Sequence, residues 1–175
     1  MKPTYGRVSR RGVIPLPYAL DHVGPMTRTV TDNALVLNII AGHDPEDPGS
    51  ARVAVPDFTA DLDKGVQGLK IGVIRRFYTQ DYVADPEMTQ SIEDAVAVLA
   101  SQGAEIQVLD PGPLADYAAV TRVILLSEAY AIHEHWLQER PQDYGALMRE
   151  RVMAGAFFRA VDYVQATRQR AVLVR

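Results

Sequence analysis

Apolar residues follow two different periods in the second part of the chain. A run of branched apolar residues at Lys70–Ile74 predicts a buried strand, and the alternation at Glu105–Leu109 predicts a second strand. Between them, apolar residues recur at helical spacing after Asp85-Pro86, a typical helix start, and Gly103 is expected to end that helix. A strand, a helix and a strand of these lengths predict an α/β fold with a right-handed βαβ unit and two parallel strands.

The first 56 residues show another pattern, with prolines spread through Lys2–Pro25. Proline disfavours helix at the residue before it, so we predict extended segments and turns there. From Ala34 to Ala41 almost every residue is apolar, after a possible cap at Thr29 or Thr31, and a helix that is apolar on every side is expected to be buried. The proline-rich segment His43–Pro56 is predicted to be an irregular surface loop.

Three further helical stretches are predicted after the βαβ unit. The first runs from Leu114 to about Gln138, the second from about Tyr144 to Gly155, and the third from Arg159 onward. The third stretch contains no Gly, Asn or Pro stop after its start. We therefore expect the last helix to be cut by the end of the chain.

The composition narrows the chemistry that the chain can perform. Its 175 residues include 47% hydrophobic and 23% charged residues, no cysteine, and a formal net charge of -4. The absence of cysteine excludes disulfides, a thiol nucleophile and thiolate metal sites. No apolar run approaches the roughly 20 residues that cross a bilayer, and the mild acidity gives no reason to expect nucleic acid. We expect a cytoplasmic protein that binds neither membrane nor nucleic acid.

The residue pattern contains no complete catalytic constellation. There is no Gly-x-Ser-x-Gly elbow, and none of Lys2, Lys64 and Lys70 has the Ser-x-x-Lys spacing that would place an amine beside a serine. The glycines of a dinucleotide-binding turn are also missing, because the strand ending at Ile74 is followed by Arg75-Arg76. The sequence therefore disfavours a serine triad and a dinucleotide cofactor.

Two groups of residues have donor atoms that metals prefer, and we expect neither to hold one. His133 and His135 lie two positions apart on a predicted helix and point to nearly opposite sides, so one is expected to be buried and the other exposed. Asp44, Glu46 and Asp47 are interrupted by proline and lack EF-hand spacing, which favours a solvated loop over a Ca²⁺ site. No metal and no cofactor is predicted.

The opening residues carry a more specific pattern, Lys2-Pro3-Thr4-Tyr5-Gly6-Arg7-Val8-Ser9, followed by Leu20-Asp21-His22-Val23-Gly24-Pro25-Met26-Thr27-Arg28. Further matches lie at Ala41–Pro48, Lys70–Val73 and Ser127-Glu128-Ala129. This pattern resembles the amidase signature family, which includes bacterial amidases and the A subunit of the glutamyl-tRNA amidotransferase. The resemblance covers essentially the whole chain and implies helices packed on part of a mixed sheet.

The resemblance also implies which residues this chain lacks and which it contributes. Family members hydrolyse amides with two serines and a lysine, and the serines lie in a Gly/Ser-rich signature just before the Lys-Pro-Thr block. Lys2 belongs to that block, so no catalytic residue is expected in this chain. Arg151 matches a segment whose arginine holds the substrate carboxylate in the amidotransferase subunits, which implies a substrate-binding role. The ordinary alternative is an arginine in a surface ion pair.

We expect residues 1–175 to be one partial amidase-signature domain. It would comprise a post-signature segment with a buried helix at 1–56, and the βαβ unit with C-terminal helices at 57–175. The expected function is that of an interior fragment, inactive alone, of an amidase that cleaves a small amide through a serine acyl-enzyme. The alternative is a non-catalytic binding or interaction module on a retained amidase scaffold. In both cases exposed apolar surface predicts self-association or a complementing chain.

Overall fold

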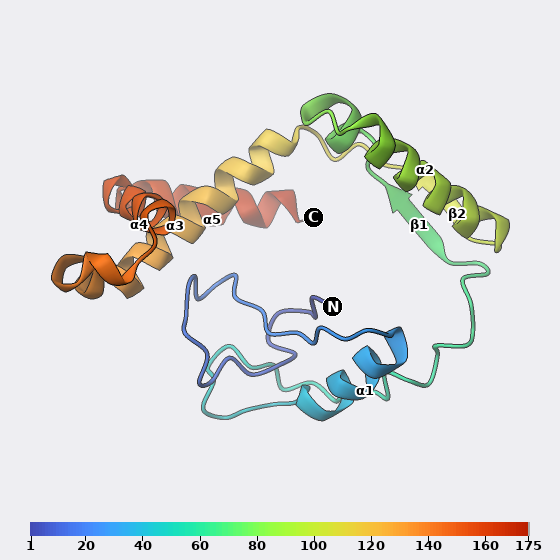
Figure 1. The fold of residues 1–175 in the computed structure, drawn as a ribbon, viewed down its shortest axis with the longest axis horizontal. Coiled ribbons are helices and arrows are strands. Elements are labelled where there is room, and N and C mark those ends of the chain that lie inside the picture. Colours follow the sequence, from blue (N-terminus) through green and yellow to red (C-terminus); the bar gives the residue numbers. More distant parts are fainter. Residues whose placement is uncertain (175) are drawn as a thin grey trace. The chain divides into compact units, whose positions relative to one another are not determined.

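The computed structural model describes residues 1–174 and shows a mixed α/β protein (Figure 1). Its residues form two compact units, one made of residues 1–60 with residues 120 onward and the other of residues 61–119. The expected division after residue 56 stays a prediction, because these units reflect proximity in space. In chain order the elements are α1 (Val30–Ile40), β1 (Lys70–Val73), the π-helical turn η1 (Phe77–Asp81), α2 (Pro86–Ser101), β2 (Glu105–Val108), α3 (Leu114–Glu139), the 3₁₀ turn η2 (Pro141–Asp143), α4 (Ala146–Met153), the 3₁₀ turn η3 (Ala154–Phe157) and α5 (Ala160–Leu173).

The unit at 61–119 contains the predicted strand–helix–strand arrangement. β1 and β2 pair in parallel, with Lys70 opposite Glu105 and Val73 opposite Val108, which confirms the parallel pairing. Figure 1 shows α2 running beside the two strands. The expected burial of the first strand is wrong for most of β1: Val73 is buried and Ile71 is half-buried, but Lys70 and Gly72 are exposed. The reason is that a two-stranded sheet with one helix leaves much of its surface open. The hand of the crossover stays a prediction.

The start of α2 follows the local sequence signals. Asp85 is the N-cap, and its carboxylate accepts a hydrogen bond of 2.8 Å from the Glu87 amide. Pro86 occupies the first helical turn, where its missing N–H costs nothing. The helix ends at Ser101, and Gly103 follows with a positive φ of 92°. The predicted helix is therefore confirmed at both ends.

The core of the larger unit lies along α3, in two clusters. In the first, Val120 and Ile124 of α3 pack against Ala166 of α5. In the second, Ala129 and Leu137 of α3 pack against Val152 of α4. The N-terminal segment contributes partly buried side chains to both clusters, namely Leu16, Ala19 and Leu20. The prediction of extended segments and turns for this N-terminal segment is confirmed, and its packing holds it against the helices.

The apolar helix near the N-terminus is less buried than its sequence predicts. Thr29 caps α1 by accepting a hydrogen bond of 3.0 Å from the Asp32 amide, as expected. Only Ala34 and Leu37 are buried, whereas Ile39 is 81% exposed. The expectation of burial on every side is therefore wrong within this chain, because the described residues supply packing for one face of the helix only.

The C-terminal helical stretches are confirmed with small shifts. α3 continues one residue beyond the predicted Gln138, and α4 is shorter than predicted because 3₁₀ turns lie before and after it. α5 runs to Leu173. Among residues 1–174, no helix combines the length and the apolar character that crossing a bilayer requires.

Candidate functional site

The serines and lysines of the described residues do not come together as a catalytic group. Ser9 Oγ donates a hydrogen bond of 2.6 Å to Asp44 Oδ2, which makes it part of a loop contact. Ser127 Oγ is buried in α3, and no hydrogen-bond partner for it is found in residues 1–174. Within the same residues, no serine hydroxyl is hydrogen-bonded to a lysine or a histidine.

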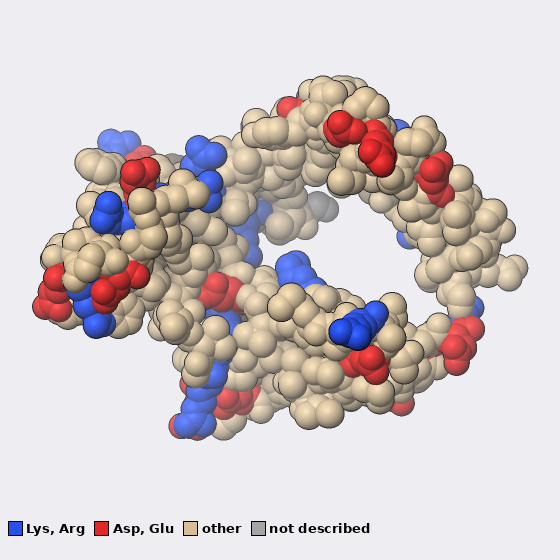
Figure 2. Space-filling view, in the orientation of Figure 1, with Lys and Arg blue, Asp and Glu red and all other residues tan. Residues whose placement is uncertain are grey.

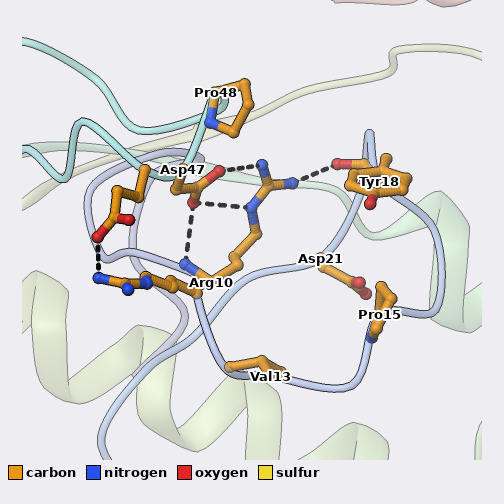
Figure 3. A pocket seen from close by; sticks show the side chains of 9 residues that line it. Arg10, Val13, Pro15, Tyr18, Asp21, Asp47 and Pro48 are labelled. Atoms are coloured by element: carbon orange, nitrogen blue, oxygen red, sulfur yellow. Dashed lines mark hydrogen bonds and ion pairs between the residues drawn. The ribbon is translucent and has the colours of Figure 1, made fainter.

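A pocket of about 240 Å³ lies where the N-terminal segment meets the loop after α1 (Figure 3). Arg10 extends into it and binds the Asp47 carboxylate with two side-chain hydrogen bonds, Nη2 to Oδ1 at 2.7 Å and Nε to Oδ2 at 3.2 Å. The Arg10 amide donates to the same Oδ2 at 2.9 Å, and the Gly49 amide donates to Oδ1 at 2.9 Å. Bidentate pairs of this geometry fix the orientation of both side chains.

The Nη1 group of Arg10 is also engaged. Nη1 donates to the Tyr5 hydroxyl at 2.9 Å and to the Tyr18 carbonyl oxygen. The guanidinium carbon lies 4.9 Å from the centre of the Tyr5 ring, which is a cation–π distance. Arg10 therefore joins the N-terminal segment to the loop that holds Asp47, and most of its hydrogen-bond donors are used within this protein.

This pocket corrects the expectation that Asp44, Glu46 and Asp47 form a solvated loop. Asp47 is 6% exposed, and hydrogen bonds from Arg10 hold the pKa of its carboxyl well below the usual range. Glu46 faces solvent and pairs with Arg11. The sequence signal was insufficient because the partner of Asp47 lies 37 residues away along the chain. No cluster of three metal-binding side chains occurs among the residues that the structure describes.

The two histidines of α3 lie as predicted, with His133 buried and the side chain of His135 71% exposed. His133 Nε2 lies 2.9 Å from the Pro15 carbonyl oxygen, and Nδ1 lies 2.8 Å from the Tyr144 hydroxyl. A carbonyl can only accept, so Nε2 donates to Pro15, and in the neutral imidazole Nδ1 then accepts from the tyrosine. Both ring nitrogens are thus used to hold the N-terminal segment and the α3–α4 connection.

Glu128 of α3 makes a second polar link between distant segments. Its Oε2 accepts a hydrogen bond of 2.7 Å from the Ala19 amide, and its Oε1 accepts one of 2.6 Å from the Tyr163 hydroxyl of α5. The hydrogen bond to the Glu128 carboxylate, together with burial, raises the pKa of Tyr163 to about 12. The protonated phenol is therefore the form that the fold stabilises.

Replacement of Tyr163 by Phe is expected to flatten the loss of stability at alkaline pH. A tyrosine in the unfolded chain has a pKa of about 10, so the contribution of Tyr163 is complete below that pH and is lost as the pH rises towards about 12. Urea unfolding at several alkaline pH values measures this loss, with Tyr82→Phe, at a 68% exposed tyrosine, as control. An unchanged pH profile in Tyr163→Phe would contradict the assignment.

Arg151, the one substrate-binding candidate, lies in the last turn of α4 and is exposed. Within residues 1–174 no ion pair holds its guanidinium. A shallow apolar pocket of about 500 Å³ lies nearby and is lined by Arg149 and not by Arg151. Its other lining residues are Leu137, Pro141, Glu150, Met153, Ala154 and Phe157. The structure therefore places Arg151 on an open surface, and its role in substrate binding stays a prediction.

Comparison with known proteins accounts for the whole chain. The family model described as "Amidase" matches residues 1–175. The chain is 34% identical over 195 residues to the A subunit of a glutamyl-tRNA(Gln) amidotransferase from Geobacter sp. (strain M21), covering 100% of this chain and 40% of that protein. It is 38% identical over 174 residues to an amidase of Pseudomonas putida, covering 99% of this chain and 37% of that protein. The chain thus spans about 40% of the length of these relatives.

Solved structures show the same partial match. One, described as "An unexpected vestigial protein complex reveals the evolutionary origins of an s-triazine catabolic enzyme", superposes with a TM-score of 0.86 at 32% identity. The match covers 98% of this chain and 36% of that one. The arrangement of helices and strands described above therefore recurs as part of a considerably longer chain.

Proposed function

This chain belongs to the amidase family, and from that membership we propose that it is an interior segment of a carbon–nitrogen hydrolase that cleaves small amides through a serine acyl-enzyme. The observation that carries the proposal is that 99% of this chain matches only 37% of an amidase 38% identical to it. The catalytic serines and lysine would lie in the part of the enzyme that this chain does not span. The segment is inactive alone and supplies scaffold and substrate contacts.

The substrate contact that we propose is Arg151. A guanidinium can hold a carboxylate with two parallel hydrogen bonds, and no described ion pair occupies that of Arg151. Its position on the exposed side of α4 leaves it available to a group brought by the rest of the enzyme. The substrate class that this favours is an amide that also carries a carboxylate.

A non-catalytic role is the second candidate, and one observation favours it. The solved structure with a TM-score of 0.86 is described as part of a vestigial protein complex. By analogy, this chain would retain the amidase scaffold as a binding partner without taking part in chemistry. A chain of this kind would form a complex and leave amide hydrolysis unchanged.

The isolated chain is expected to show no hydrolysis of simple amides above the buffer rate. Ammonia release from a panel of aliphatic and aromatic amides measures this, with Ser9→Ala and Ser127→Ala as controls. Turnover that either replacement abolishes would contradict the proposal, because it would place a nucleophile in this chain. Turnover that survives both replacements would point to a contaminating enzyme.

The same proposal is tested in an active context by a chimera in which this chain replaces the matching segment of the Pseudomonas putida amidase. The chimera is expected to hydrolyse amides. Arg151→Lys in the chimera is expected to raise KM for a carboxylate-bearing amide about tenfold or more, because a lysine offers no fork of donors. The KM for an amide without a carboxylate is expected to stay unchanged. An unchanged KM for both would assign Arg151 to the scaffold, and a folded but inactive chimera would favour the non-catalytic role.

A further inference from the structure

The shallow apolar pocket that Arg149 lines is formed by the end of α3, by η2, by α4 and by η3, and we call it the α4 groove. It has a volume of about 500 Å³ and lies within the larger unit. Phe157, one of the side chains that line it, is 83% exposed, and Met153, another, is 40% exposed. Large apolar side chains that meet in an open groove mark a surface that is covered in an assembly.

Two charged side chains of opposite sign line the α4 groove, and neither has an ionic partner. Arg149 is half-buried and Glu150 is exposed. Among the residues that the structure describes, no ion pair includes either of them. Because the two charges cancel, the groove has no net charge that would attract a small anion or cation. A partner that satisfies both must bring a negative group to Arg149 and a positive group to Glu150.

A second copy of this chain meets that requirement by symmetry. In a twofold contact both copies use the same surface, so Arg149 of each copy can lie opposite Glu150 of the other. Phe157 of each copy can enter the apolar part of the facing groove, whose volume is sufficient for an aromatic ring. Figure 2 shows acidic and basic groups intermixed around the position of α4, at the left of the view. No surface of a single sign therefore opposes the contact.

We propose that the α4 groove is a twofold interface between two copies of this chain. Two Arg149–Glu150 pairs set the register of the interface, and the two Phe157 side chains supply much of the apolar surface that is removed from water. Neither the groove nor its pairing uses Arg151, which does not line it. The inference is therefore independent of the proposed function, and either can fail without the other.

Charge reversal tests the pairing. Sedimentation equilibrium of the unaltered chain is expected to show a reversible dimer with a dissociation constant in the micromolar range. Arg149→Glu places two carboxylates opposite each other in both pairs, and Glu150→Arg does the same with two guanidinium groups. Each variant alone is expected to weaken the dimer at least tenfold. An equimolar mixture of the two variants is expected to form a heterodimer about as tight as the unaltered dimer, because both pairs are restored.

The apolar part of the contact is tested by Phe157→Ala. This replacement is expected to weaken the dimer at least tenfold and to leave the melting temperature of the dilute, monomeric chain unchanged, because the side chain faces solvent there. Arg168→Glu, an equal charge reversal at an exposed position of α5 outside the groove, is the matched control. It is expected to leave the dissociation constant unchanged.

Several outcomes would overturn the proposal. They are an unaltered chain that stays monomeric at high concentration, a dimer that Phe157→Ala or the charge variants form as tightly as the unaltered chain, and a mixture of the two charge variants that stays monomeric. Binding of the unaltered chain to phospholipid vesicles that Phe157→Ala abolishes would assign the groove to a membrane surface and would overturn it too. Amide hydrolysis by the isolated chain would instead refute the proposed function and leave the dimer unaffected.

Discussion

Asp47→Asn is expected to lower the free energy of unfolding by about 3 kcal/mol, the typical cost of removing one partner from a buried ion pair. The side chains of Arg10 and Asp47 are only 11% and 5% exposed. The replacement removes the negative charge that compensates the Arg10 guanidinium, and an amide accepts fewer of the four hydrogen bonds that the carboxylate takes. Urea unfolding followed by circular dichroism measures the change.

The neighbouring ion pair supplies the control for that experiment. Glu46 pairs with Arg11 on the surface, where both side chains are about 60% exposed. Glu46→Gln is therefore expected to cost less than about 1 kcal/mol. Equal effects of the two replacements would show that the Arg10–Asp47 pair contributes no more than a surface contact, and the role assigned to this pocket would be wrong.

Gly155→Ala is expected to destabilise the chain by about 2 kcal/mol, within the range found for overpacked cores. Gly155 is buried in η3, and a Cβ there would collide with the carbonyl oxygen of Leu126 and lie 2.6 Å from Tyr130 Cβ. The first of these atoms belongs to the backbone of α3 and cannot rotate away. Relief therefore requires η3 to move off the helix, which loosens the packing of Val152 against Ala129.

Gly145→Ala is the matched control, because a Cβ at that position meets no atom within 4 Å. Gly145 is the N-cap of α4, where alanine is less favourable than glycine, so its replacement is expected to lower the free energy of unfolding by no more than about 1 kcal/mol. Thermal and urea unfolding of the Gly155→Ala and Gly145→Ala variants measure the difference in their free energies of unfolding. Equal stability of the two would contradict the close approach of η3 to α3.

Local signals predicted the elements of this fold well. Asp85-Pro86 marked the start of α2, Thr29 capped α1, and the strands at Lys70 and Glu105 paired as expected. Each of these depends on residues within one turn or one strand, where backbone preferences and hydrogen bonds act directly. The parallel pairing followed because a helix between two strands leaves few other connections.

Burial was the property that the sequence predicted poorly. The apolar pattern of α1 and of β1 predicted buried elements, yet Ile39 is exposed and Val73 is the one buried residue of β1. An apolar pattern indicates that a segment is stable when other apolar side chains cover it. Those side chains can belong to another polypeptide or to a part of the protein outside residues 1–175. The apolar pattern therefore predicts how much of an element's surface must be covered, and the structure shows how much of it this chain covers.

The candidate site was predictable only in part. The positions of His133 and His135 followed from helical geometry, because residues two apart face different ways. The Arg10–Asp47 pair and the Glu128–Ala19 link join residues 37 and 109 positions apart, and nothing in the local sequence marks either partner. Arg151 was found through the resemblance alone, and its surroundings in the fold do not by themselves assign it a ligand.

The order of segments in the two units has a consequence for synthesis on the ribosome. The unit at 61–119 is continuous, whereas the larger unit is completed only by residues from 120 onward. The hydrogen bonds of the Pro15 carbonyl with His133 and of the Ala19 amide with Glu128 can form only after more than 100 further residues have been synthesised. The nascent N-terminal segment therefore leaves the exit tunnel without its partners. Closing such long loops is entropically costly and slow, so the continuous unit is free to fold first.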